Sequence, residues 1–121
     1  MDNTNLLSHR DTEADIKKIE SRIEKFLEKF TNLSKYKKKN LRYALIELSK
    51  GMYYNKCFLR DYKKQLRNLD ANKTMNPGYR IECMSYTLNR IRQVRRTMTF
   101  IMNRYSKYIT DYTKLNEKQA H

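Results

Sequence analysis

The chain has 121 residues, enough for one domain with a hydrophobic core and too few for two independent domains. It carries 27 Lys and Arg against 13 Asp and Glu, and a net charge of +14 is typical of proteins that bind a polyanion such as nucleic acid. Two Gly, one Pro and no Trp disfavour a turn-rich β fold and predict an all-α protein. No apolar run approaches the roughly 18 residues that span a bilayer, so we expect no membrane insertion.

The N-terminal third is predicted to hold one helix. Residues 1–10 show no apolar periodicity, so we expect a disordered leader there. A helix over 11–33 follows, with Asp11 or Thr12 as its cap. Its apolar residues recur at helical spacing and predict one buried face: Ile16, Ile19, Ile23, Phe26, Leu27 and Phe30.

Residues 34–112 are predicted to form two helices, the first of which Ser34 can cap. Gly51 lies inside the first helix, costs up to about 1 kcal/mol relative to Ala, and marks a bend or a close neighbour. Turn residues concentrate in 70–78, where the chain reverses. The first helix has a coiled-coil-like seam, in which steps of four and three alternate: Leu41, Leu45, Leu48, Met52, Asn55, Leu59, Tyr62, Leu66 and Leu69. The second helix, over 79–112, repeats this spacing with Arg95 at one missing step: Ile81, Met84, Leu88, Ile91, Met98, Met102, Tyr105, Ile109 and Tyr112.

These patterns together predict the arrangement of the helices. Two helices of about 35 residues, each roughly 50 Å in length, pack antiparallel when a short turn joins them. The predicted fold is therefore all-α, a long antiparallel helical hairpin over 34–112 with an additional N-terminal helix packed against it. The polar residues 113–121 are predicted to be a disordered tail.

Positive charge is concentrated on the hairpin. Residues 34–110 hold 19 basic and 4 acidic side chains, whereas residues 1–33 hold 6 basic and 7 acidic ones. An ordinary solvated surface carries a more even mixture, so we interpret the excess as a phosphate-binding surface, for which Arg is well suited. The candidate residues form a cluster at the start of the first hairpin helix, a cluster on the second, and one further outward position: Lys35, Lys37, Lys38, Lys39 and Arg42; Arg90, Arg92, Arg95 and Arg96; and Lys107. Tyr79 and Tyr86 are the tyrosines most free to stack on unpaired bases.

Catalytic chemistry has little support in the sequence. His9 lies in the predicted leader and His121 is the last residue, so neither is placed to be held against a nucleophile or a metal. No phosphate-binding glycine loop or HExxH motif occurs. We therefore expect no enzyme activity, no cofactor, no metal site and no small-molecule substrate.

Two stretches of the hairpin resemble a ribosomal family. Asn76-Pro77-Gly78-Tyr79-Arg80-Ile81, followed by Thr87-Leu88-Asn89-Arg90-Ile91-Arg92-Gln93-Val94, is similar to the large-subunit ribosomal protein of universal family twenty-nine, particularly its mitochondrial branch. That branch has Asn-Pro or Ser-Pro, an Arg-Leu pair, and then a helix reading Ser/Thr-Met-x-Arg-Ile-Lys-x-Val. Upstream, Leu48-Ser49-Lys50-Gly51-Met52-Tyr53 resembles the family's Leu-x-Lys-Leu-Trp-Tyr, with Gly and Met in place of Leu and Trp.

The resemblance implies a two-helix hairpin that binds large-subunit rRNA beside the exit tunnel, near the neighbouring ribosomal protein of family twenty-three. It implies an RNA-facing or hairpin-fixing role for Arg80, Arg90 and Arg92, and a mitochondrial location.

Two other functions stay open on the sequence alone. A helical subunit of a DNA replication or chromatin complex, in the nucleus or cytoplasm, would use the seams to bind partner helices. An adaptor at a membrane surface would use the basic face, although little apolar surface accompanies the outward arginines.

Overall fold

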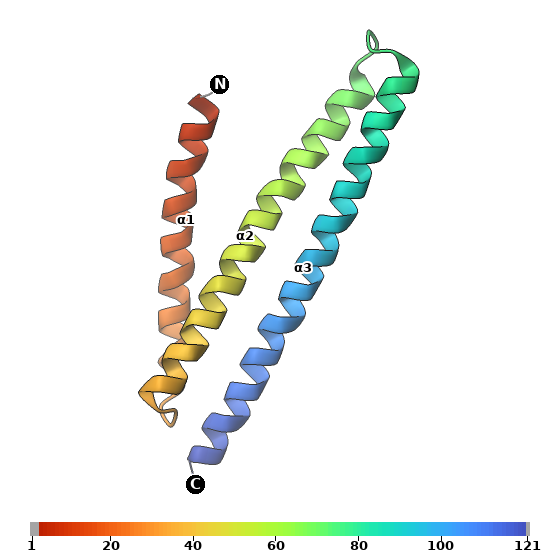
Figure 1. Cartoon of the computed structure of the whole chain (residues 1–121). Helices are drawn as coiled ribbons and strands as arrows, with labels where there is room; N and C mark the ends of the chain where they lie inside the picture. Colours follow the sequence, from red (N-terminus) through yellow and green to blue (C-terminus); the bar gives the residue numbers. More distant parts are fainter. Residues whose placement is uncertain (1–2, 121) are drawn as a thin grey trace. The chain divides into compact units, whose positions relative to one another are not determined.

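A computed structural model describes the backbone of residues 3–120 and the side chains of residues 12–120. It contains three helices, α1 (Asn3–Leu27), α2 (Lys35–Ala71) and α3 (Pro77–Gln119) (Figure 1), and no strand among these residues. The prediction of an all-α fold is confirmed. The chain divides into two compact units, although α2 and α3 contribute to both: unit 1 comprises residues 1–50 and 104–121, and unit 2 comprises residues 51–103.

Helix α1 begins earlier than the sequence pattern predicted. It starts at Asn3 and not at residue 11, so it includes residues 3–10 of the predicted leader, and residues 11 and 12 lie inside the helix rather than at its N-cap. Residues 3–10 contain no Gly or Pro that would interrupt a helix. Met1 and Asp2 lie outside the described residues, as does the side chain of His9.

Helix α3 ends later than predicted. It continues to Gln119, so the predicted disordered tail is helical as far as that residue. The side chain of Leu115 packs against the core of unit 1, and Asn116 Oδ1 accepts a hydrogen bond of 2.9 Å from the backbone N–H of Asn32. One apolar contact and one long-range hydrogen bond therefore hold the last turns of the helix.

Unit 1 is built around an apolar core to which all three helices contribute. The predicted buried face of α1 is confirmed, because Ile23, Leu27 and Phe30 are each at most 5 % exposed. Phe30 and Leu33 come from the loop after α1, so this loop also contributes to the core. These side chains pack with residues of α2, and partly buried residues of α3 cover them: Leu41, Leu45 and Ile46; Tyr105, Tyr108, Ile109, Tyr112 and Leu115.

Side-chain caps fix where α2 and α3 begin. Ser34 Oγ accepts a hydrogen bond of 3.2 Å from the N–H of Lys37, which confirms the predicted cap of α2. Asn76 Oδ1 accepts one of 3.1 Å from the N–H of Tyr79, and Pro77 occupies the first position of α3, where its missing N–H costs nothing.

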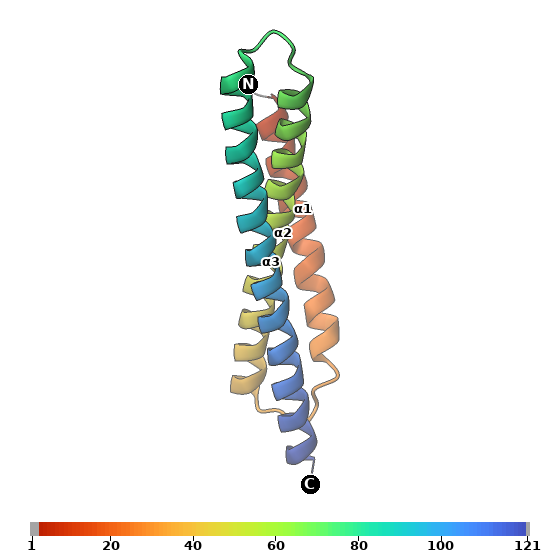
Figure 2. The same ribbon diagram turned by 90° about the vertical axis from the view of Figure 1, so that its right-hand side faces the viewer.

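Unit 2 is an antiparallel helical hairpin in which α2 and α3 lie side by side (Figures 1 and 2). Every predicted seam position of α2 in this unit is half-buried, as expected. The seam predicted for α3 is wrong by one residue at several steps. Ile81, Leu88 and Met102 are 61 %, 39 % and 59 % exposed. The inward positions are instead Met84, Thr87, Ile91, Val94, Met98 and Ile101.

The shift of the α3 seam has a simple geometric cause. Adjacent helical residues point about 100° apart, so either Thr87 or Leu88, and either Ile101 or Met102, can face α2. Leu88 is more hydrophobic than Thr87, and Met102 continues the alternating steps of four and three that begin from Leu88, so both residues suggested the wrong register. In the observed register every position of the α3 seam is filled by an inward side chain, because Val94 takes the position that the sequence pattern assigned to Arg95.

Gly51 lies inside an unbroken α2 and marks a close neighbour. A Cβ atom at this position would lie 3.2 Å from Cδ1 of Ile101 on α3. Its carbonyl accepts a hydrogen bond of 2.7 Å from Nδ2 of Asn55, which satisfies the one amide of the α2 seam.

Replacing Leu45 by Ala should unfold the chain more easily, because Leu45 is fully buried in unit 1. Truncation of such a side chain costs about 2–5 kcal/mol. Leu88→Ala is the matched control, since Leu88 is exposed and its loss should cost under about 1 kcal/mol. Urea unfolding followed by circular dichroism measures both, and equal effects would contradict the assigned core.

Candidate nucleic-acid interface

Unit 2 carries more positive charge than its share of the chain. Residues 51–103 contain eleven basic side chains and three acidic ones, a net charge of +8, whereas the rest of the chain contributes +6. Between Glu82 and Asp111 the sequence of α3 has no acidic residue. The arginines from Arg90 to Arg96 therefore have no acidic residue near them along their own helix.

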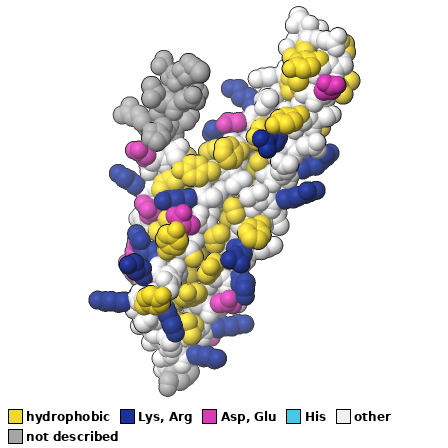
Figure 3. All heavy atoms as spheres, in the orientation of Figure 1, with side chains coloured by type: hydrophobic (Ala, Val, Ile, Leu, Met, Phe, Trp, Pro, Cys, Tyr) yellow, Lys and Arg dark blue, Asp and Glu magenta, His cyan; other side chains and the backbone are white. Residues whose placement is uncertain are grey.

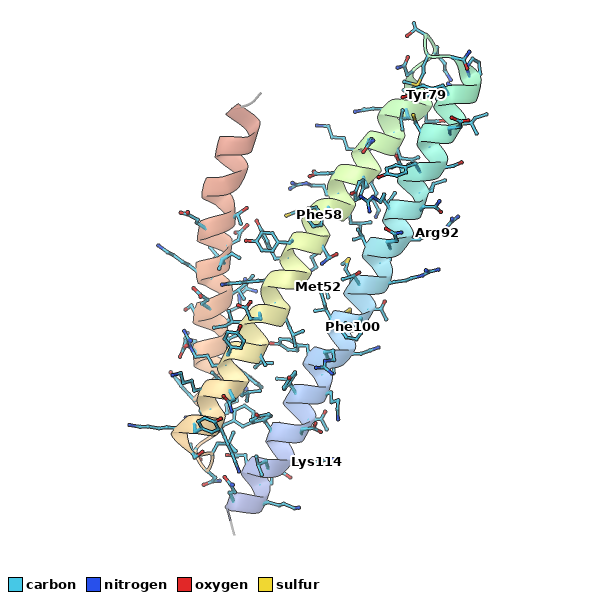
Figure 4. The ribbon with its side chains drawn as sticks, in the orientation of Figure 1. Met52, Phe58, Tyr79, Arg92, Phe100 and Lys114 are labelled. Carbon is cyan, nitrogen blue, oxygen red and sulfur yellow. The ribbon has the colours of Figure 1, made fainter. Side chains whose placement is uncertain are left out.

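The outer ridge of α3 consists of Arg92 and Arg96, which lie on the side away from the buried row. Both side chains are exposed, and Arg92 projects from the side of α3 that faces away from α2 (Figure 4). Arg92 Nη1 donates a hydrogen bond of 2.9 Å to Asn89 Oδ1, which orients the guanidinium without neutralising it. Arg95 is also exposed but borders the buried row beside Val94. No carboxylate of the described residues lies within ion-pair distance of these three arginines.

A second set of exposed side chains on unit 2 is aromatic. Hydrophobic side chains gather on the face of this unit that Figure 3 shows, and Phe58 and Phe100 are 51 % and 62 % exposed (Figure 4). Tyr79 and Tyr86 are exposed, as predicted. A hydrogen bond with the side chain of Cys83 is the largest cause that raises the pKa of Tyr79 above 10.0.

Tyr86 is already in contact with a cation. The guanidinium of Arg90 lies over its ring, 5.5 Å from the centroid, and Arg90 Nη1 donates a hydrogen bond of 3.4 Å to Gln93 Oε1. Arg90 is therefore held on the aromatic face of the hairpin, at a different angle around α3 from Arg92 and Arg96.

Arg80 faces the turn between α2 and α3 rather than solvent. Its Nη1 donates hydrogen bonds to the backbone carbonyls of Asp70 and Asn72, at 3.4 and 3.3 Å, where the end of α2 leaves carbonyls without helical partners. Its Nε is buried and has no hydrogen-bond partner among the described residues. Of the two roles that the resemblance implied for Arg80, these contacts support the hairpin-fixing one.

The predicted cluster at the start of α2 lies beside acidic residues of α1. Lys35, Lys38, Lys39 and Arg42 line one shallow groove with Leu27, Glu24 and Glu28. Arg42 also forms an ion pair with Glu24. Part of the charge of this cluster is therefore balanced within unit 1, which the charge count by sequence segment did not reveal. Lys37 is half-buried at the same end of α2.

Lys107 belongs to a different unit from the outer ridge. It belongs to unit 1, and its Nζ forms an ion pair of 3.1 Å with Asp111, one turn along α3. The structure thus brings together Arg92 and Arg96 of the predicted set, with Arg90 and Arg95 on either side of them around the same helix.

Sequence reasoning missed one set of basic residues, which we name the α2 stripe. Four basic side chains of unit 2 line a shallow groove together with Leu59: Lys56, Arg60, Lys63 and Arg67. Their spacing of four, three and four residues places them on one face of the helix, and this spacing was the available signal. Arg60 contacts the neighbouring carboxylate of Asp61, 3.3 Å away, with both side chains about two-thirds exposed.

Comparisons of the chain with protein-family models, with curated proteins and with solved structures give no match. Within residues 3–120, no helix combines the length and the apolar character that crossing a membrane requires. Among residues 12–120, whose side chains the structure describes, no three His, Cys, Asp or Glu side chains come together as metal ligands would.

Arg80→Gln should destabilise the chain by about 1–3 kcal/mol, because it removes charged hydrogen bonds to the carbonyls at the end of α2. Arg96→Gln removes the same charge from an exposed position and should change stability by no more than about 0.5 kcal/mol. Thermal unfolding of the two variants checks the difference. An unchanged melting temperature for Arg80→Gln would show that the turn does not depend on this side chain.

Proposed function

We propose that the protein is a non-enzymatic RNA-binding protein and that the outer ridge of α3 contacts the RNA backbone. The observation that carries the proposal is the exposure of Arg92 and Arg96 without any carboxylate of the described residues in ion-pair distance. Unpaired, exposed guanidinium groups on a unit of charge +8 repel one another, and a polyphosphate relieves this repulsion.

The resemblance at 76–94 adds the identity of the RNA to the proposal. It supports large-subunit rRNA, in a mitochondrial ribosome, with the family twenty-three protein as neighbour. Two properties of unit 2 agree with that proposal: the residues similar to the family lie in a helical hairpin, and Arg80, the first residue of the matched Arg-Ile pair, holds its turn. The proposal also includes the finer prediction of a single antiparallel hairpin over 34–112, against which α1 packs.

A second candidate function is a helical subunit of a DNA replication or chromatin complex. The exposed Phe58, Phe100 and Met102 favour it, because apolar side chains of this size on a helical pair suit partner helices. Purification of the tagged protein with nuclease treatment separates the candidates: partners held through RNA are released, and partners held by protein contacts stay bound.

The double variant Arg92→Gln, Arg96→Gln should bind RNA more weakly and with a lower dependence on salt. Each phosphate contact contributes about 0.7–0.9 to the slope of log K against log salt. Losing two contacts should therefore lower the magnitude of the slope by about 1.4–1.8. Fluorescence anisotropy with a labelled RNA stem-loop at several salt concentrations measures this slope.

Lys17→Gln, Lys18→Gln is the control for that measurement. It changes the net charge by the same amount at exposed positions of α1, outside the proposed ridge, and should leave the slope nearly unchanged. An equal fall in both variants would mean that net charge alone governs binding and that the ridge is not a site.

The ribosomal part of the proposal predicts co-sedimentation. The tagged protein should migrate with large ribosomal subunits of mitochondria in a sucrose gradient at moderate salt, and the ridge variant should shift toward the top of the gradient. Wild-type protein that stays at the top would refute a ribosomal role while leaving RNA binding as such untouched.

A further inference from the structure

The α2 stripe carries an excess of positive charge in a groove that also offers apolar surface, because Arg60 is its one member in contact with a carboxylate of the described residues, that of the neighbouring Asp61. Lys56, Arg60, Lys63 and Arg67 line the groove with Leu59, and no acidic side chain lines it. At 100° per residue the stripe lies on the side of α2 roughly opposite Phe58 (Figure 4). It is thus separate from the aromatic face and lies on a different helix from the outer ridge.

The same basic pattern occurs earlier in α2, where the structure shows what covers it. Lys35, Lys39 and Arg42 recur 21 residues later as Lys56, Arg60 and Lys63, with the same steps of four and three. In a helix that packs against another helix, positions three heptads apart lie on the same face. The two sets of cations therefore face the same side of their local helical pair.

In unit 1 the occupant of this face is an amphipathic helix with an acidic edge. Glu24 and Glu28 of α1 line the groove with the lysines, Glu24 pairs with Arg42, and Leu27 lines the same groove. Leu27 also belongs to the core that α1 shares with α2. The spacing Glu-x-x-Leu-Glu places one apolar and two acidic side chains on the same face of the helix.

In unit 2 the corresponding groove has cations and apolar neighbours but no acidic helix among the described residues. Four residues of α3, spaced seven residues apart, each come directly after a residue that faces α2. They form one row along the helix: Ile81, Leu88, Arg95 and Met102. Lys56 and Lys63 likewise follow the seam residues Asn55 and Tyr62 of α2. In an antiparallel pair such rows border each other on one side, so this pattern places the exposed Leu88, and nearer the turn Ile81, beside the α2 row that Lys56 and Lys63 share with Asp70.

We propose that the α2 stripe of unit 2 and the row of Ile81, Leu88 and Met102 form a docking surface for an acidic amphipathic helix of a partner protein. The charge of the groove requires glutamate or aspartate on the edge of that helix, as α1 supplies in unit 1. The apolar residues of the partner helix cover Ile81, Leu88 and Met102, whose side chains are 61 %, 39 % and 59 % exposed in the chain alone.

The apolar component favours a protein helix over RNA at this surface. An RNA backbone needs only the cations, whereas Leu59 and the three residues of α3 gain from contact with apolar side chains. Ile81, Leu88 and Met102 are spaced by multiples of seven residues, with Arg95 at the intervening step. Seven residues span about 10.5 Å at 1.5 Å per residue, which matches the repeat of a helix laid along the pair. The outer ridge has no such row, since Asn89, Arg92 and Arg96 are polar.

The test uses the full chain and two labelled peptides of three heptads. Both have Leu at the seam positions; one has Glu at the flanking positions and the other has Gln. Wild-type protein should bind the Glu peptide at least about tenfold more tightly than the Gln peptide, since charge complementarity sets the choice of partner.

The double variant Lys56→Glu, Lys63→Glu should remove that preference, and the double variant Ile81→Ser, Leu88→Ser should weaken binding of both peptides. All these side chains are exposed, so circular dichroism should show unchanged helix content.

Arg92→Glu, Arg96→Glu is the matched control, because it makes the same change in net charge on the outer ridge. It should retain the preference for the Glu peptide and lose binding of the RNA stem-loop, whereas the stripe variant should retain RNA binding.

Equal binding of both peptides to wild-type protein, or a Glu preference that survives in the stripe variant, would overturn the inference. Loss of RNA in the stripe variant would make the stripe an RNA contact and would also overturn it, with the proposed function intact. RNA binding that survives in the ridge variant would refute the proposed function and leave the docking surface standing.

Discussion

The choice of which α3 residues are buried against α2 determines which surfaces unit 2 offers to a binding partner. Because Thr87, Ile91 and Val94 face inward, the residues on either side of them are assigned to defined faces of the helix. Arg96 then points directly away from α2, Arg90 lies on the aromatic face, and Arg95 borders the α2 stripe. A rotation of α3 by one residue would turn Leu88 inward and move every arginine by about 100°. The seam therefore specifies the charged surfaces as well as the core.

Most of the fold could be predicted from the sequence, for reasons that differ among the helices. The α2 seam was readable because every step from Leu41 to Leu69 except Asn55 offers a large apolar or aromatic residue. On α3 the apolar residues come in adjacent pairs, and a seven-residue repeat does not say which member faces inward. The C-terminal end of α3 was missed because Asn116 is held by Asn32, a contact between residues 84 positions apart that no local pattern contains.

The candidate site could be predicted in part. Arg92 and Arg96 were identifiable because a helical period and a one-sided charge suffice to place them outward. The neutralisation of the cluster at Lys35 was not, since Glu24 and Glu28 precede it in another helix and become its neighbours only when α1 folds back. Charge counted along the sequence therefore overstated the exposed charge at the start of α2, and it gave no reason to single out Lys56 and Lys63.

The repetition of the basic pattern along α2 connects stability with recognition. In unit 1, the cations beside Glu24 and Glu28 belong to an intramolecular packing surface, and the apolar core beneath that surface keeps the charges together. In unit 2, no acidic helix of the described residues covers the same pattern, and Asp61 contacts only Arg60, so the repulsion among the other cations and the exposure of Ile81 and Leu88 remain as free-energy costs of the isolated chain. A partner helix would relieve both costs at once, whereas RNA would relieve only the first. The outer ridge differs in this respect, because its arginines stand beside polar residues and phosphate alone satisfies them.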